Sequence, residues 1–291
     1  MNHDKQLALI KLYIEKMPSL PTTVTKILEV CNDPQISPAD LNRIISVDPV
    51  LMGKVLKLIN SAYYGLSQEV TSLVRAIIML GINTVKNLAL STAVLATVGR
   101  NSNFQALNMD GFWRHSLCTG VTGRLIAKKR KIDSKILEEY FIAGLLHDIG
   151  KIPLNNRLSE DYLTAMGESD IRHSPLHVSE REVFGIDHTN VGHMILQTWK
   201  LDEAIRDAVL FHHTPLDYSG NHIDIVYSTA CANYFSNFFE IGFSGDRYPE
   251  KLPPEVFRHL GVSMEFMEEI DETVQQEIEK ASIFLKLSNT Q

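Results

Sequence analysis

The sequence predicts an all-α protein, and two observations support that prediction. Apolar residues recur at helical rather than alternating spacing along nearly the whole chain, as amphipathic helices require. No Asn-Gly or Asp-Gly turn joins two runs of β-branched residues, so hairpins are not indicated. With 291 residues, of which 44% are hydrophobic, the chain is long enough to bury a large core.

The first part of the chain contains six predicted helices. Their expected ranges are 5–16, 22–31, 38–46, 49–60, 71–79 and 82–98. The third begins with a helix-start pattern, in which Ser37 can cap, Pro38 needs no amide partner and Asp40 suits the positive end of the helix dipole.

A polar interval at 100–103 follows the sixth helix and indicates a boundary. We therefore expect an N-terminal helical subdomain over 1–105 and a second helical subdomain over 106–291. The helices expected in the second are 110–128, 134–147, 176–184, 189–199, 203–213, 223–239 and 264–285. Glycines and prolines between Gly242 and Pro254 predict a loop or linker there.

Composition narrows the classes of function. The balance of 28 Lys and Arg against 35 Asp and Glu argues against a dedicated nucleic-acid binder, because such proteins usually carry a basic face. Cys31, Cys118 and Cys231 are widely spaced, so neither a disulfide framework nor a thiolate zinc site is indicated, and a reducing cytoplasm fits.

The first residues lack the apolar core of a signal peptide, and polar residues interrupt the longest apolar stretch, 80–98. We expect no membrane span.

The segment most informative about chemistry runs from Gly144 to Lys151. It places an imidazole and a carboxylate on consecutive residues, His147 and Asp148, at the end of an apolar helix where Gly150 lets the backbone turn. Both groups coordinate metal ions, so their adjacency indicates a shared ion.

Four further histidines are candidates for the same ion. Helical spacing places His115, His188 and His212 each on a largely apolar face, and His213 follows directly. The ordinary interpretation of any one is a core histidine bonded to a carbonyl, so a scaffold without an ion stays open. Burying several imidazoles costs free energy unless a shared ligand compensates, which favours a metal site for the set.

The remaining histidines lie in termini, polar stretches or on a mixed helix face. We interpret them as surface residues: His3, His173, His177, His193, His222 and His259. Pro175 lies between His173 and His177 and argues against a helical metal-binding pair there.

A histidine-rich shell with one carboxylate favours a transition ion over Mg²⁺ or Ca²⁺, which prefer oxygen ligands. The expected cofactor is therefore one or two ions of Fe, Mn, Zn, Co or Ni. Such a site can activate water near neutral pH and, with two ions, can hold a phosphoryl group during in-line attack.

These residues resemble the HD superfamily of metal-dependent phosphohydrolases. The order of His115, the His147-Asp148 doublet, His188 and the His212-His213 pair matches its pattern. Lys151 extends the likeness to the HD-GYP branch, the cyclic-di-GMP phosphodiesterases.

The likeness to that branch stops at two points. No Gly-Tyr-Pro follows His213, and Asn233 stands where the branch has its last metal-binding aspartate. A neutral amide is a poorer ligand than a carboxylate, which puts a second ion in doubt. The resemblance implies this ligand set: His115, His147, Asp148, His188, His212, His213 and, more weakly, Asn233.

The first part of the chain resembles the HDOD domain, the HD-related output domain of bacterial signalling proteins. The matching segments are Leu20-Pro21, Asp33-Pro34, Asp48-Pro49, Asn60 to Gly65 and Ala76 to Gly81. With Phe112 to His115 and Gly144 to Gly150, the resemblance covers roughly residues 15–240. The family is all-α and is generally treated as a regulatory module that interacts with other proteins.

The resemblance implies a cytoplasmic bacterial signal-transduction protein whose HD-like part keeps a transition-metal site and whose partner is a signalling protein. A nucleotide or phosphate is the expected ligand beside the ion, and neither nucleic acid nor membrane is expected. The second hypothesis is a metal-dependent phosphohydrolase acting on a nucleotide or cyclic dinucleotide. In that case Asp148 and Lys151 would be catalytic, with Lys151 steadying phosphate charge.

Overall fold

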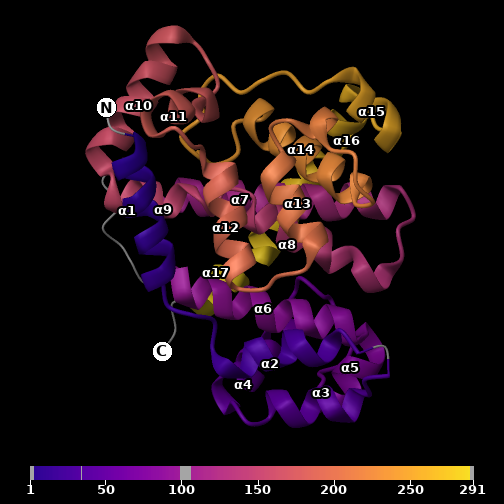
Figure 1. The fold of residues 1–291 in the computed structure, drawn as a ribbon. Coiled ribbons are helices and arrows are strands. Elements are labelled where there is room, and N and C mark those ends of the chain that lie inside the picture. The colour runs from indigo at the N-terminus through magenta and orange to yellow at the C-terminus, as the bar shows by residue number, and fades with distance from the viewer. Residues whose placement is uncertain (1–2, 34, 99–105, 289–291) are drawn as a thin grey trace.

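The computed structural model describes residues 3–33, 35–98 and 106–288, and within these ranges it contains helices and no strand (Figure 1). The all-α prediction is confirmed. The predicted boundary at 100–103 lies outside the described residues. The helices of the first part are α1 (His3–Lys16), α2 (Thr22–Cys31), α3 (Pro38–Ile45), α4 (Pro49–Ile59), α5 (Leu73–Leu80) and α6 (Ile82–Val98).

Helices α2 to α5 form a small bundle below α6 in Figure 1. The predicted start of α3 is confirmed, because the Asp40 amide donates to Ser37 Oγ at 3.2 Å and Pro38 is the first helical residue. Helix α6 contacts α2, α4 and α5 as well as α8 in the second part of the chain, so it joins the two parts. Among the described residues, no single helix is long and apolar enough to cross a membrane, and α5 and α6, which would suffice together, are separated by a bend of 116°.

The second part contains α7 (Met109–Lys129), α8 (Leu137–Leu146), α9 (Lys151–Arg157), α10 (Ser159–Arg172), α11 (Leu176–Phe184), α12 (His188–Thr198), α13 (Glu203–Phe211), α14 (Ile223–Phe238), α15 (Pro254–Leu260), α16 (Met264–Ala281) and α17 (Ile283–Ser288). Short 3₁₀ helices cover Ser134–Ile136 and Pro215–Asp217. The pair α7 and α8 lies at its centre, with α14 packed on α7 (Figure 1). A Cβ at Gly144 would lie 2.6 Å from the Thr119 main chain, so this close helix contact requires glycine.

The first and last helices each pack against the opposite part of the molecule. Helix α1 packs against α9, α11 and α12 of the second part through a face that includes the buried Ile10 and Ile14. Helix α17 packs back against α4 and α6. The division of the chain at residue 105 therefore stays a prediction.

Several helices differ from those expected. Helices α9, α10 and α15 were not predicted, and the single helix expected over 264–285 is broken at Ser282 into α16 and α17. Pro153 looks like a helix breaker but lies in the first turn of α9, where no amide donor is needed. Helix α10 buries only Tyr162, Ala165 and Ser169, a stripe too narrow to give a clear apolar pattern.

A tyrosine-bearing turn after α4 connects the small bundle to one end of the α7–α8 pair, the end that carries Arg124 and Glu138. The Tyr63 ring packs against Phe141 and Phe284, with ring centres 5.5 and 5.4 Å away. The Arg124 guanidinium lies 5.0 Å from the centre of the Tyr63 ring, and its Nε is 3.0 Å from Glu138 Oε1. At this end of the pair, the buried Glu138 carboxylate therefore lies beside the Arg124 guanidinium.

Candidate metal centre

The His147-Asp148 doublet lies in a tight turn between α8 and α9. Helix α8 ends at Leu146, and α9 begins at Lys151. A Cβ at Gly150 would lie 1.9 Å from the His188 carbonyl oxygen, so only glycine lets this turn pack against the start of α12. The turn thereby brings Asp148 beside His188.

Every site residue predicted from the sequence lies in this region. Asp148 Oδ1 is 3.2 Å from His188 Nε2 and 3.8 Å from His212 Nε2. Asp148 Oδ2 is 3.3 Å from His147 Nε2 and 3.8 Å from His115 Nε2. We call the six residues the histidine–aspartate cluster: His115, His147, Asp148, His188, His212 and His213. All six side chains are buried.

The cluster contains two groups of potential metal ligands, and Asp148 belongs to both. One group is Asp148, His188, His212 and His213, and the other is His115, His147 and Asp148. In each group the ligand atoms lie within 4.8 Å of one another.

Four of the imidazole rings are held in the same way, through Nδ1. Nδ1 of His147 is 2.6 Å from the Gly144 carbonyl, and Nδ1 of His212 is 2.8 Å from the Val209 carbonyl. A carbonyl oxygen only accepts hydrogen bonds, so both nitrogens carry the proton. The other two rings are held by carboxylates, His188 Nδ1 by Glu180 Oε2 at 2.6 Å and His213 Nδ1 by Glu250. The neutral form of each ring then presents an Nε2 lone pair to the interior.

This arrangement brings nitrogen and oxygen donor atoms close together. His188 Nε2 and His213 Nε2 are 3.0 Å apart, so a proton on His188 bridges the two rings in the metal-free chain, and a bound ion would take its place. Asp148 Oδ1 and His212 Nε2 are buried and form no hydrogen bond with the described residues. Buried polar atoms normally have partners, and three imidazoles with one carboxylate suit a transition ion. The residues therefore fit the expected cofactor.

The charges of the cluster depend on its burial. Burial lowers the pKa of His115 to about 3, and burial together with neighbouring histidines lowers the pKa of His212 and His213. Burial also acts to lower the pKa of His188, but the Glu180 carboxylate outweighs it and raises this pKa to about 9. Burial acts to raise the pKa of Asp148, yet the adjacent His147 ring and the Lys151 side chain hold it well below its usual value.

Lys151 and Asn233 make the two ligand groups unequal. Lys151 Nζ lies 2.8 Å from Asp148 Oδ2, so an ammonium already neutralises the oxygen that faces His115 and His147. Asn233 Oδ1 lies 3.0 Å from His115 Nε2 and accepts a hydrogen bond from Asn237 Nδ2 at 3.1 Å. Because an amide oxygen only accepts, His115 donates to it. The group around His115 is thus largely satisfied by protein atoms, whereas the group around His212 is not.

Comparison with known proteins assigns the family. The HDOD domain family model matches residues 17–215, well over half of the chain. The chain belongs to the HDOD family. An uncharacterized protein of Treponema pallidum (strain Nichols) is 24% identical over 254 residues, which cover 87% of this chain and 47% of that protein. The chain thus spans about half the length of this curated relative.

Solved structures similar to this HDOD protein share its fold. An HDOD domain protein of unknown function from Geobacter sulfurreducens has a TM-score of 0.74 at 23% identity, covering 96% of this chain and 97% of that one. A protein of Shewanella amazonensis SB2B, provisionally named a phosphohydrolase, has a TM-score of 0.70 at 21% identity, covering 95% and 98%. A provisionally named signal transduction protein of Marinobacter aquaeolei VT8 has a TM-score of 0.75 at 18% identity, covering 100% and 67%.

One interpretation of the sequence was wrong. His177 was assigned to the surface, but it is buried on α11, and its ring stacks on His213 with centres 4.3 Å apart. The misleading feature was Pro175, which does not interrupt a helix here but immediately precedes α11. His3, His173 and His259 are exposed as expected, while His193 and His222 are half-buried.

Two residues that hold the imidazoles were missed, Glu180 and Glu250. Glu180 is fully buried on α11, where its spacing of three from His177 and four from Phe184 marks a buried face. Glu250 lies in the segment 239–253 between α14 and α15, most of which falls in the loop predicted from Gly242 to Pro254. We call this segment the strap.

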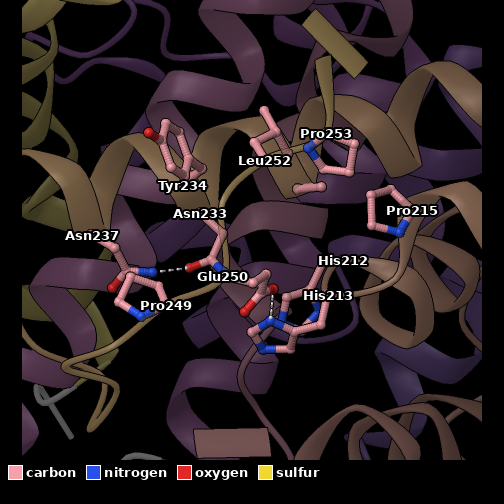
Figure 2. Close-up of a pocket in the computed structure, with 11 residues that line it drawn as sticks. His212, His213, Pro215, Asn233, Tyr234, Asn237, Pro249, Glu250, Leu252 and Pro253 are labelled. Atoms are coloured by element: carbon pink, nitrogen blue, oxygen red, sulfur yellow. Dashed lines mark hydrogen bonds and ion pairs between the residues drawn. The ribbon is translucent and has the colours of Figure 1, made fainter. Parts of the chain in front are cut away.

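The strap covers the cluster on the side of His212 and His213. Figure 2 shows Glu250 pointing from the strap toward His213, beneath Leu252 and Pro253. The cavity between the strap, α14 and the two histidines has a volume of about 10 Å³, enough for roughly one water molecule. Any larger ligand would require the strap to move.

Proposed function

We propose that this HDOD protein is a cytoplasmic bacterial signal-transduction protein that binds a transition-metal ion in its HD-like part. One observation carries the proposal: four imidazoles are anchored through Nδ1 while their Nε2 atoms converge on Asp148. Orienting ligand histidines through the second ring nitrogen is characteristic of metal sites. A hydrogen-bonded core network without an ion would instead pair the atoms that are left unpaired here.

The main ion would be held by Asp148 Oδ1, His188, His212 and His213. This choice follows from the inequality of the two groups, because Lys151 and Asn233 already satisfy much of the group around His115. The candidate ions are Fe, Mn, Zn, Co and Ni. When bound, such an ion supplies Lewis acidity and a site for an anionic ligand such as a phosphate.

The signalling part of the proposal concerns helices α2 to α6. Helix α6 contacts α8, whose C-terminal end carries His147, and the tyrosine-bearing turn contacts Phe141 on the same helix. Occupation of the cluster would bias the packing of these helices, and a signalling protein would read their outer surface. Hydrogen exchange tests this link, because ion loading should change protection in α6 and in the turn at Tyr63.

Metal analysis tests the main proposal. Chain expressed with each candidate ion should contain about one tightly bound ion per chain, and His212→Ala and Asp148→Asn should lose it. His193→Ala is the matched control, because His193 is half-buried on the same helix as His188 but lies outside both ligand groups. Wild-type chain that remains free of metal under all these conditions would refute the proposal.

A second candidate is a metal-dependent phosphohydrolase acting on a nucleotide or cyclic dinucleotide. The observation that favours it is the position of Asp148 between two ligand groups, an arrangement suited to two ions that share one carboxylate. Asp148 would hold the ions, and the buried Lys151 ammonium would steady phosphate charge.

An assay separates this candidate from a purely regulatory role. Nucleotides and cyclic dinucleotides are incubated with chain loaded with Fe²⁺, Mn²⁺ or Ni²⁺. Hydrolysis that disappears in His147→Ala and Asp148→Asn, while His193→Ala keeps it, would support the enzyme. No turnover above the level of these variants would leave only the regulatory role.

A further inference from the structure

A second set of potential ligands lies beside the histidine–aspartate cluster, under the strap. His177, His213 and Glu250 offer ligand atoms within 4.8 Å of one another. His177 Nδ1 and Glu250 Oε2 are 3.8 Å apart. Both atoms are buried, and neither has a hydrogen-bond partner among the described residues. The His177 side chain is 9% exposed, so its nitrogen is removed from bulk water.

The distance between these atoms is informative. At 3.8 Å they are too far apart for a hydrogen bond. Nitrogen and oxygen ligands lie about 2.0–2.2 Å from a zinc-sized ion, so two ligands of one ion are separated by at most about 4.3 Å. The gap therefore suits a cation that both atoms contact.

The strap also brings negative charge into this region. The carboxyl groups of Glu250 and Asp246 come from the same short segment, and Asp246 Oδ2 is likewise buried without a hydrogen-bond partner among the described residues. Removing carboxylates from water is costly unless a cation compensates. Glu250 Oε1 is occupied by the bond with His213 Nδ1, which leaves Oε2 for that cation.

We propose that His177 Nδ1 and Glu250 Oε2 form an auxiliary position for a divalent transition-metal cation, which fastens the strap over the histidine–aspartate cluster. Glu250 then links two elements at once, because one of its oxygens holds the His213 ring and the other holds the auxiliary ion. The position goes beyond the proposed function, since it shares neither Asp148 nor any Nε2 atom of the main group. The position has only two protein ligands, so it binds an ion more weakly than the main group.

Upstream of Glu250 the strap is held by two exposed contacts. Arg247 pairs with Asp170 at 3.0 Å, and the Tyr248 ring meets His173 with centres 4.5 Å apart. The auxiliary ion would add a further attachment directly over the cluster, beside the bond between Glu250 and His213. Strap opening would then depend on the concentration of free ion.

Counting bound Zn²⁺ and Co²⁺ by equilibrium dialysis tests the position. His177→Phe keeps an aromatic ring over His213 but has no ligand nitrogen, and Glu250→Gln, on the half-exposed strap, is the second variant. Each should bind one equivalent fewer than wild type at saturating ion. His173→Ala is the control, because His173 contacts the strap but belongs to no ligand group. If both variants bind as many ions as wild type, the auxiliary position does not exist.

Limited trypsin digestion gives a readout that does not depend on counting ions. Arg247 and Lys251 are exposed on the strap. Zn²⁺ should slow cleavage after them severalfold in wild type and His173→Ala, but not in His177→Phe. Equal protection of His177→Phe would overturn the proposal.

The main and auxiliary proposals fail in different ways. Loss of one ion in His212→Ala, combined with unchanged binding in His177→Phe and Glu250→Gln, would refute only the auxiliary position. Binding that depends on His177 and Glu250 but not on His212 would refute only the main group. Wild type that binds no ion would refute both.

Discussion

The two ends of the α7–α8 pair bury polar side chains in opposite ways. At one end, Arg124 on α7 and Glu138 on α8 neutralise each other at 3.0 Å beside Tyr63. At the other end, nine residues and about 14 Å away along each helix, His115 and His147 face Asp148. There the His147 and His212 rings are anchored through Nδ1, and Asp148 Oδ1 and His212 Nε2 have no hydrogen-bond partner among the described residues.

The difference is one of charge, because the first end pairs one carboxylate with one cation of the chain, whereas the second gathers several imidazoles around one carboxylate. Arg124 and Glu138 carry opposite charges, so the folded chain supplies both partners. The histidine–aspartate cluster brings several lone pairs to one point and includes a single permanent carboxylate, Asp148. We infer that the first end is structural in any condition, whereas the second depends on an added cation.

The largest expected effect comes from removing the cation of the Arg124–Glu138 pair. Arg124→Met would leave the Glu138 carboxylate, which is 4% exposed, without a cation. Removing one partner of a buried pair costs about 3–5 kcal/mol, so urea unfolding should show a loss of that order whether or not metal is present. Arg114→Met is the control, because Arg114, on the same helix as Arg124, forms an exposed pair with Glu279 of α16 that is worth less than about 1 kcal/mol. Equal losses in the two variants would contradict the distinction.

The second-largest expected effect is the loss of stability when the ion is removed from the histidine–aspartate cluster. A ligand bound to the folded chain at 100 times its Kd adds about 2.7 kcal/mol to the free energy of unfolding. EDTA should therefore lower the stability and Tm of wild type and of Arg124→Met by similar amounts, since the two ends are far apart. EDTA should not change the stability or Tm of His212→Ala, because this variant has already lost the ion. A Tm of wild type that does not respond to EDTA would favour a metal-free scaffold.

A smaller effect is expected from the residue that orients His188. Glu180→Gln removes the carboxylate that holds His188 Nδ1, and loss of such a partner typically weakens metal affinity about 10- to 100-fold. Titration with Zn²⁺ in a competing chelator would measure the change. Glu182→Gln, two residues on and exposed, should bind like wild type. A normal affinity in Glu180→Gln would show that backbone packing alone orients His188.

The smallest expected effect is a pH dependence of the metal-free chain. The folded pKa of His188, about 9, lies above the ordinary value of 6.5, so its proton contributes stability that is fully present below pH 6.5 and lost as pH rises through 9. Urea unfolding should show a loss of about 1 kcal/mol between pH 7.5 and 8.5. Loaded chain should lack this loss, because the ion replaces the proton. His188→Gln should lack it too, and a wild-type curve without the slope would contradict the assignment.

The sequence predicted the parts of the centre that depend on one helix at a time. The faces of His115, His188 and His212 follow from helical spacing, and the His147 doublet from its position before Gly150. What holds the rings could not be read in this way, because Glu180 and Glu250 reach their histidines from other segments. Nor could the inequality of the two ligand groups, which depends on the hydrogen-bond directions of Asn233 and Lys151.

The fold was predicted where apolar periodicity was strong and missed where it was weak. Helix α3 begins at its predicted cap, while α10 was overlooked because its buried stripe is narrow. His177 shows a related limit: the proline two residues before it marks a helix start, and the same pattern also describes a surface turn.

The crossing of the chain ends has a practical consequence for dissecting this protein. A fragment cut to the family match, 17–215, would lose α1, whose Ile10 and Ile14 face the HD-like part, and also α14, which carries Asn233. It would expose apolar surface on α7, α9 and α12 together. Neither half can therefore be expected to behave as a detachable module, and swapping halves between relatives would have to carry both termini along.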